Sequence, residues 1–229
     1  MTEHPANTST GAVFDIDGTL LDTNYLHVVA WSAAFDDFGF RVEMADIHRA
    51  IGMPSEALVD RLVHRDDPAL VQAHSDHFAR LRDRFGVRRI TGARHLLRRC
   101  AELGWTVVLA TSAGASDLDW MLPTIDADDV ITGTTTSEDV ERGKPHPDVL
   151  LAAMHGHGLS NQHTITVGDS VWDMESARRA HTPSIGLAAG GISAADLQRA
   201  GADEVYADPA DLVEHLTASA LGVRAPAAR

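Results

Sequence analysis

Two aspartates, Asp15 and Asp17, stand where an apolar run that includes Val13 and Phe14 comes to its end. Alternate residues of an extended strand point to the same side, so the two carboxylates are expected to lie close together. Carboxylates at such a distance repel each other unless one is protonated or a cation lies between them. Aspartates before Gly18 are also ordinary turn formers, but a solvated turn gains nothing from following a buried strand. The pattern favours a carboxylate nucleophile beside an acid/base, with the turn as the alternative.

A pair of hydroxyl side chains, Thr111 and Ser112, follows a second apolar run, residues 107–110. Hydroxyls and free backbone N–H groups at the start of a helix can hold phosphate oxygens. Serine and threonine are also common N-caps of helices that bind nothing. The pair therefore indicates a phosphate site only in combination with other residues of matching chemistry.

Lys144 is the only lysine of the chain, in which the Lys and Arg residues together number 19. A lysine ammonium is a compact charge with three donors, whereas the arginine guanidinium is a planar fork. Pro145 favours an extended backbone at Lys144, and Pro145 or Pro147 can start a helix. The choice of lysine here predicts a group that neutralises a phosphate and neighbouring carboxylates. A lone lysine at the surface is the alternative.

A second acidic turn, with Asp169 and Asp173, follows the β-type run at residues 163–167. Ser170 and Asp173 have the spacing of a capping box, which explains Asp173 without any site. Asp169 has no such explanation. Mg²⁺ takes oxygen ligands and keeps several of its waters, so Asp15, Asp169 and the backbone carbonyl of Asp17 are its expected protein ligands.

Short β-type runs recur along the chain and begin at Gly11, Thr106, Asp129, His163, Thr182 and Asp203. Several are continuously apolar, as expected for strands that are buried on both faces. Helical patterns separate them, for example those that begin at Ala93, Pro147 and Ser193. This alternation predicts an α/β fold with a doubly wound parallel sheet.

The spacing of these runs predicts an inserted helical segment. The first two runs begin 95 residues apart, whereas a strand–helix–strand unit takes roughly 30 residues. The extra segment holds almost only helical patterns, including an apolar stripe formed by Leu26, Val29, Ala30, Ala33 and Ala34. We predict a core of residues 1–22 and 89–229 and a helical cap of residues 23–88, called the insert below. Because ligands bind beyond the carboxyl ends of strands in such sheets, the insert is expected to cover the site.

The charge, the apolar runs and the cysteine content of the chain argue against several classes of binding partner. The chain carries 33 acidic and 19 basic residues and a net charge of −14, which argues against nucleic acid as a partner. No apolar run approaches the ~20 residues of a membrane span, and the N-terminus lacks a signal segment. The single cysteine, Cys100, excludes an internal disulfide and fits a reducing compartment. We expect a cytoplasmic protein that binds no membrane, with disorder in residues 1–9 and 222–229.

Taken together, the motifs resemble those of the haloacid dehalogenase-like (HAD) superfamily. The resemblance rests on four segments in the same order along the chain: DIDGT from Asp15, a threonine and serine at a strand end, GKP around Lys144, and GDSVWD from Gly168. It extends over nearly the whole chain, including the helical insert after the first motif. The chain is most similar to the branch of phosphoglycolate phosphatase and β-phosphoglucomutase.

The resemblance implies a mechanism and a role for each motif residue. Asp15 would be the nucleophile that becomes an aspartyl-phosphate, and Asp17 the acid/base for both half-reactions. Thr111, Ser112 and Lys144 would bind the transferring phosphoryl group. Mg²⁺ would be held by Asp15, the Asp17 carbonyl, Asp169 and Asp173, with Asp173 either a ligand or behind the ligands. The insert would close over a small phosphorylated metabolite and exclude water.

The insert contributes two further candidates, Thr23 and His27, where related sugar-phosphate mutases carry similar residues. His27 would contact the substrate or connect the insert to the core, and Trp31 has packing in the first helix as its simpler role. His74 and His77 share a helical face but have no acidic or cysteine partners. We therefore assign them to the surface or the packing of the insert.

The motifs favour a Mg²⁺-dependent phosphatase and leave a β-phosphoglucomutase-like sugar-phosphate mutase as the alternative. A mutase is expected to have more cations in its cap; the insert has no lysine, although Arg49, Arg61 and Arg65 remain candidates. A dehalogenase would lack the second acid, Asp17, and a phosphonate hydrolase would need a lysine in the insert. A receiver-type signalling domain has its acceptor aspartate later in the chain and no helical insert after it.

Overall fold

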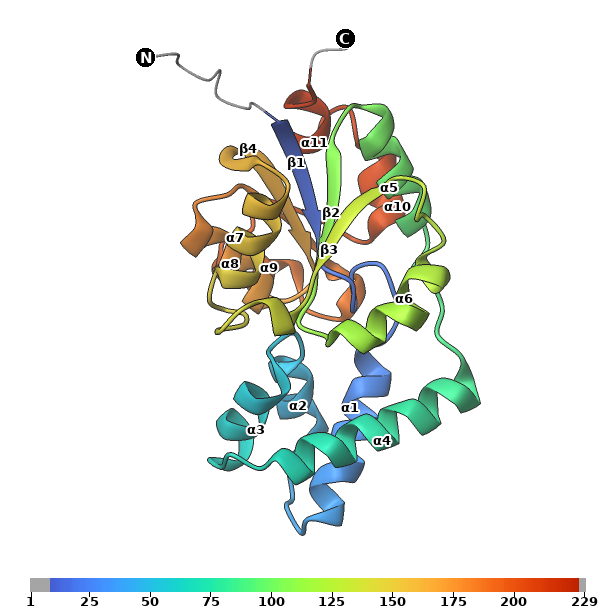
Figure 1. Cartoon of the computed structure of the whole chain (residues 1–229), viewed down its shortest axis with the longest axis vertical. Helices are drawn as coiled ribbons and strands as arrows, with labels where there is room; N and C mark the ends of the chain where they lie inside the picture. Colours follow the sequence, from blue (N-terminus) through green and yellow to red (C-terminus); the bar gives the residue numbers. More distant parts are fainter. Residues whose placement is uncertain (1–8, 227–229) are drawn as a thin grey trace.

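The computed structural model describes residues 9–226, and within them a single sheet of six parallel strands runs through the molecule (Figure 1). The strands are β1 (Ser9–Phe14), β2 (Thr106–Ala110), β3 (Ile131–Thr135), β4 (Leu159–Gly168), β5 (Ser184–Leu187) and β6 (Glu204–Tyr206). Their order across the sheet is β3-β2-β1-β4-β5-β6, and every neighbouring pair is parallel. The predicted α/β fold with a parallel sheet is confirmed.

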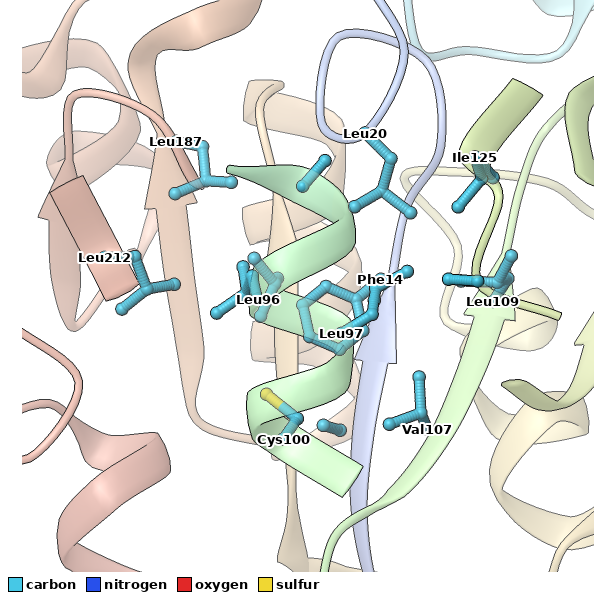
Figure 2. Close-up of a cluster of buried hydrophobic side chains, with 14 of the residues drawn as sticks. Phe14, Leu20, Leu96, Leu97, Cys100, Val107, Leu109, Ile125, Leu187 and Leu212 are labelled. Atoms are coloured by element: carbon cyan, nitrogen blue, oxygen red, sulfur yellow. The ribbon is translucent and has the colours of Figure 1, made fainter. Parts of the chain in front are cut away.

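Helices cover both faces of the sheet, because alternate residues of each strand point to opposite sides. Phe14 packs with α5 and α10 on one face, whereas its neighbour Val13 packs with α7 and α8 on the other. Figure 2 shows the first of these clusters, with Cys100 buried in it as a free thiol. The helices after the insert are α5 (Ala93–Glu102), α6 (Leu118–Ile125), α7 (Asp148–Gly156), α8 (Val171–Ala180), α9 (Ala194–Ala200), α10 (Pro209–Glu214) and α11 (Ala220–Val223).

Four helices lie between β1 and α5 and gather at one end of the molecule, beyond the carboxyl end of β1 (Figure 1). They are α1 (Asn24–Asp37), α2 (Met44–Ala50), α3 (Ser55–Val63) and α4 (Pro68–Phe85), and they share a hydrophobic cluster of their own. All four fall inside the segment of residues 23–88 assigned to the insert. That the insert is a separate domain stays a prediction.

The expected apolar stripe of α1 is right for Ala30 and Ala34, which are buried, and wrong for Val29. Val29 is 41% exposed, whereas Val28, Trp31 and Phe35 are buried in the cluster of the insert. The helix is apolar on most of its faces, so the spacing of its residues does not select the side that packs against α4. The packing role given to Trp31 holds.

The expected disorder near the carboxyl end is wrong for part of that segment. Residues 220–223 form α11, and Leu221 is fully buried and accepts a hydrogen bond from Trp105 Nε1. At the other end, β1 already begins at Ser9. The remaining residues of that expectation, 1–8 and 227–229, lie outside the described part of the chain. Within the described part, no helix is both long enough and apolar enough to span a membrane.

Candidate active site

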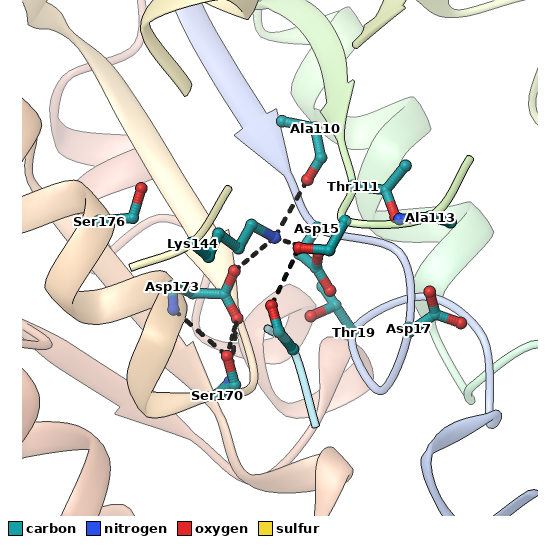
Figure 3. Close-up of polar contacts among 12 residues, drawn as sticks. Asp15, Asp17, Thr19, Ala110, Thr111, Ala113, Lys144, Ser170, Asp173 and Ser176 are labelled. Carbon is teal, nitrogen blue, oxygen red and sulfur yellow. Dashed lines mark hydrogen bonds and ion pairs between the residues drawn. The ribbon is translucent and has the colours of Figure 1, made fainter. Parts of the chain in front are cut away.

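The loops that carry the motif residues meet at the carboxyl edge of the sheet. Asp15 directly follows β1, Thr111 follows β2 and Asp169 follows β4. Because β1 lies between β2 and β4 in the sheet, these three loops are neighbours. Lys144 reaches the same place from the segment before α7 (Figure 3). This is the edge at which open α/β sheets bind their ligands.

Lys144 is buried among acceptors, so it is not a lone surface lysine. Its Nζ forms an ion pair and hydrogen bond with Asp15 Oδ1, lies 2.7 Å from Asp173 Oδ1 and donates to the Ala110 carbonyl at 3.2 Å. The side chain is only 5% exposed. Burial alone would lower the pKa of Lys144, but Asp15 and Asp173 together raise it. The ammonium is therefore fixed and charged beside the Asp15 carboxylate.

Asp173 forms the predicted capping box and also contacts Lys144. Its Oδ2 accepts hydrogen bonds from the backbone N and the Oγ of Ser170, at 3.1 and 2.6 Å, which completes the capping box of α8. Its other oxygen faces Lys144. The capping box therefore explains Asp173 only in part.

Asp169 is held by Thr19, the last residue of the first motif, and by Asn24, which follows that motif. Its Oδ1 accepts from Thr19 Oγ1 at 3.0 Å, and its Oδ2 accepts from Asn24 Nδ2 at 2.8 Å. The role of Asn24 was not foreseen, because nothing in its residue type or spacing distinguishes it at the start of α1. Both contacts fix the carboxylate at the carboxyl end of the sheet.

Three carboxylates are buried together: Asp15, Asp169 and Asp173. One oxygen atom from each lies within 4.8 Å of the corresponding atoms of the other two. One ammonium cannot neutralise three ionised carboxylates, so without a further cation the cluster must hold protons or an excess of negative charge. Burial is the main cause that raises the pKa of Asp15 to about 7 and the pKa of Asp169 well above its usual value. The oxygen-only donor set and the excess charge fit a hard divalent cation.

Asp17 lies apart from this cluster and faces the insert. Its Oδ1 accepts from Thr23 Oγ1 at 2.5 Å and lies 3.5 Å from His27 Nε2. Burial alone would raise the pKa of Asp17, but His27 and the hydrogen bond from Thr23 lower it below its usual value. The two predicted residues of the insert thus contact the predicted acid/base, and Asp15 and Asp17 have different electrostatic surroundings.

Behind His27 lies His74, whose assignment to packing is confirmed, whereas the expectation that the two histidines lack an acidic partner is wrong for His77, whose Nε2 lies 2.7 Å from Asp37 Oδ2. His74 is buried, its Nε2 lies 3.1 Å from His27 Nδ1, and its ring stacks on Trp31 with the centroids 3.9 Å apart. His27 is the polar partner that the sequence analysis did not find for it. The two histidines come from α1 and α4, and only the packing of these helices brings them together.

The two hydroxyl residues of the second motif are placed differently. Thr111 is buried and its Oγ1 accepts from the backbone N of Ala113 at 3.0 Å, as in a helix cap. Ser112 Oγ donates to the Gly52 carbonyl of the insert at 2.9 Å. Ser112 also lines the cavity of about 380 Å³ that separates the insert from the core, whose floor contains Asp15 and Asp17.

Comparison with known proteins identifies the family. The model of the family described as haloacid dehalogenase-like hydrolase matches residues 12–187, more than half of the chain. The chain belongs to this family. Among solved structures, a hydrolase from Pseudomonas syringae is 34% identical, with a TM-score of 0.84 over 92% of this chain and 99% of its own.

Two further proteins are similar to the chain. The pyrophosphatase PpaX of Oceanobacillus iheyensis is 24% identical over 77% of this chain and 82% of its own. A β-phosphoglucomutase from Clostridium difficile, with a TM-score of 0.79 over 92% of this chain and 96% of its own, is only 17% identical and shows the fold alone. The predictions of a HAD fold and of an enzyme of the phosphatase type are confirmed.

Proposed function

We propose that the chain is a Mg²⁺-dependent phosphatase that hydrolyses a small phosphorylated metabolite through an aspartyl-phosphate on Asp15. The observation that carries this proposal is the surroundings of Asp15, which has Lys144 on one side and the cavity on the other. A buried carboxylate held by an ammonium and open to a cavity is suited to attack a phosphorus atom. Asp17 lies at the same cavity with separate partners, as an acid/base requires.

In the first half-reaction, Asp15 attacks the phosphorus atom and the bond to the leaving oxygen breaks. Asp17 donates a proton to that oxygen, and His27, 3.5 Å away, is placed to share the proton with it. In the second half-reaction, Asp17 takes a proton from water, the water oxygen bonds to phosphorus and the bond to Asp15 breaks. The lowered pKa of Asp17 suits this second step, which needs an ionised base, and works against the first step, in which Asp17 must carry the proton that it donates.

Asp15, Asp169, the backbone carbonyl of Asp17 and, directly or through water, Asp173 would hold the metal. When bound, Mg²⁺ would offset the excess negative charge of the cluster and allow an anionic phosphate to approach the carboxylates. Lys144 keeps the Asp15 carboxylate in position and would contact a phosphoryl oxygen by exchanging one of its three present acceptors, Asp15, Asp173 or the Ala110 carbonyl, for it. Thr111 and Ser112 are proposed to bind the other phosphoryl oxygens, through their backbone N–H groups or hydroxyls.

The mutase alternative has less support from the side chains of the insert. Arg61 lies over the ring of Trp172 and Arg65 over that of Phe40, and Arg49 forms an ion pair with Asp46. None of these three arginines is among the residues that line the cavity. A second phosphate of a bisphosphorylated intermediate would therefore find no arginine of the insert there.

One assay tests the proposal. Purified enzyme is incubated with a panel of phosphate esters, pyrophosphate and glucose 1-phosphate, with and without Mg²⁺, and released phosphate and glucose 6-phosphate are measured. We expect Mg²⁺-dependent release of phosphate from at least one ester. Conversion of glucose 1-phosphate to the 6-phosphate without net release would support the mutase instead. A cytoplasmic location, expected from the single cysteine, stays part of the proposal.

A further inference from the structure

The cavity between the insert and the core is lined by acidic side chains where the leaving group of a substrate would lie. Besides Asp15 and Asp17, three carboxylates line it: Glu56 from α3 and Asp117 and Glu138 from the core. Among the described residues that line this cavity there is no lysine and no arginine. Lys144 is not one of them, and its ammonium is engaged by Asp15 and Asp173.

The three carboxylates also lack cationic partners. Asp117 accepts a hydrogen bond from Trp120 Nε1 at 3.0 Å, and Glu138 accepts one from the backbone N of Ala115 at 2.9 Å. Neither these two nor Glu56 forms an ion pair with any Lys, Arg or His within residues 9–226. Their negative charges therefore act on whatever occupies the cavity.

The two histidines of the cavity do not offset these charges. Burial lowers the pKa of His74 well below its usual value, so this ring is neutral near pH 7. His27 lies against Asp17 and His74, and its Nε2 faces the Asp17 carboxylate. Apart from His27, whose Nε2 faces the Asp17 carboxylate, a negatively charged leaving group would find no side chain that could carry a positive charge among the described residues that line this end of the cavity.

The remaining walls favour an uncharged carbon skeleton with hydroxyl groups. The rings of Phe78 and Trp120 lie 5.9 Å apart, and Trp31 completes an aromatic wall. Besides Ser112, four further serines line the cavity and offer hydroxyl donors and acceptors: Ser55, Ser75, Ser116 and Ser137. Aromatic rings pack well against the C–H groups of sugars and polyols, and a volume of about 380 Å³ is within the usual range for ligand pockets.

We propose that the substrate is a phosphate monoester of a polyol whose leaving group carries no negative charge. A carboxylate or a second phosphate on the leaving group would face Glu56, Asp117 and Glu138 in a partly closed cavity, where charges are screened less than in water. An amino group would be accepted. This inference rests on the proposed phosphatase function and adds the class of substrate.

Matched pairs of esters test it with the Mg²⁺-loaded full chain. One pair is 2-hydroxyethyl phosphate and 2-phosphoglycolate, and another is sorbitol 6-phosphate and 6-phosphogluconate; each pair exchanges a hydroxymethyl group for a carboxylate. We expect kcat/KM for each carboxylate to be lower by about tenfold or more, as expected for at least one uncompensated charge pair. Phosphoethanolamine should be hydrolysed at least as well as 2-hydroxyethyl phosphate.

Two double variants assign the effect to the cavity carboxylates. Glu56→Gln with Glu138→Gln should raise the kcat/KM ratio of the anionic to the neutral ester several-fold. Glu43→Gln with Glu141→Gln removes the same charge from two exposed residues outside the cavity and should leave the ratio unchanged. If both double variants change the ratio of kcat/KM for the anionic and neutral esters equally, only the net charge of the chain matters and the inference is overturned.

The outcomes separate this inference from the function on which it rests. If carboxylate esters are hydrolysed as fast as their neutral partners, the inference is wrong and the phosphatase proposal stands. If no ester or pyrophosphate is hydrolysed in a manner that depends on Asp15, the phosphatase proposal fails and the inference fails with it.

Discussion

Lys144 Nζ lies 2.7 Å from Oδ1 of Asp173, the residue whose other carboxylate oxygen caps the first turn of α8. One carboxylate thus ties the position of the lysine to the start of a core helix. The same ammonium contacts Asp15 and the carbonyl of Ala110 at the end of β2. The position of the charge beside the proposed nucleophile is therefore set by the sheet and by α8 together.

Replacing Lys144 by arginine keeps the charge but not this geometry. The guanidinium is larger and planar, so it cannot contact Asp15, Asp173 and the Ala110 carbonyl from the space of one ammonium. We expect kcat/KM to fall by about 10²-fold or more, as for the loss of one preorganised electrostatic partner. Steady-state kinetics with a neutral alkyl phosphate, together with thermal unfolding, measure the effect.

The matched control is Arg142→Lys, two residues away. Arg142 is exposed and pairs only with Asp148 on the surface. Exposed ion pairs contribute about 0–1 kcal/mol, so this exchange should leave activity near that of the wild type. Near-wild-type activity of Lys144→Arg as well would remove Lys144 from the mechanism.

The sheet and most of the candidate site could be predicted from the sequence, because both depend on short runs of apolar residues and on the polar residues that directly follow them. Continuous apolar runs such as residues 107–110 marked the buried parallel strands, and polar residues directly after them marked the edge where loops meet. Asp15, Lys144, Asp169 and Asp173 are brought together as expected. Their roles in catalysis remain predictions.

A substitution at Gly18 tests whether the backbone must approach the Asp169 carboxylate closely. Its φ is +73°, and a Cβ there would meet Asn24 Nδ2 and Asp169 Oδ2, with Asp169 Cγ at 2.6 Å. Gly18→Ala should therefore displace the Asp169 carboxylate as well as strain the backbone. We expect activity to fall by at least about tenfold. We also expect weaker Mg²⁺ binding, measured as a higher Mg²⁺ concentration for the half-maximal rate.

Gly39→Ala is the control for backbone strain alone. Gly39 has a similar φ of +76°, but a Cβ there would meet nothing within 4 Å. The change should lower the free energy of unfolding by about 1–2 kcal/mol without altering the Mg²⁺ dependence. Equal effects of both substitutions on the Mg²⁺ dependence would argue against a metal held by Asp169.

The identity of the metal is tested by exchange. Treatment with a chelator should silence the enzyme, Mg²⁺ should restore it, and Ca²⁺ should fail, because Ca²⁺ takes more ligands at longer distances. The measurement is the rate of phosphate release after dialysis against each ion. Full activity in excess chelator would remove the metal from the account.

The arrangement of the insert could not be predicted to the same depth. The apolar residues of α1 surround most of the helix, so only its packing on α4 decides that Val28 is buried and Val29 exposed. The contact between His27 and His74 joins residues 47 positions apart in the sequence. Asn24 holds Asp169 across 145 positions. No local period or motif encodes contacts of this kind.

Asp17 should matter more for poor leaving groups than for good ones. An alkoxide needs a proton to leave, whereas a nitrophenolate leaves largely without one, and acid/base catalysis contributes about 10²–10⁴-fold. Asp17→Asn should therefore slow phosphorylation of the enzyme much more with an alkyl phosphate than with an aryl phosphate, as measured by single-turnover kinetics. The hydrogen bond from Thr23 can persist, because an amide oxygen also accepts.

Asp22→Asn provides the comparison, since Asp22 is exposed, close in sequence and outside the cavity. It should leave both rates unchanged. If Asp17→Asn slows both substrates equally, Asp17 is a positioning residue rather than the acid/base.

The central claim is that the phosphoryl group passes through Asp15, and trapping that intermediate tests it most directly. Asp17→Asn enzyme, with its hydrolysis step slowed, is mixed with an activated aryl phosphate and Mg²⁺, quenched in acid and analysed by peptide mass spectrometry. A phosphoryl group on the peptide at Asp15, absent when Asp15→Asn is added to the same variant, is the result we predict. Turnover without any phosphorylated Asp15, or a phosphoryl group at another residue, would contradict the account.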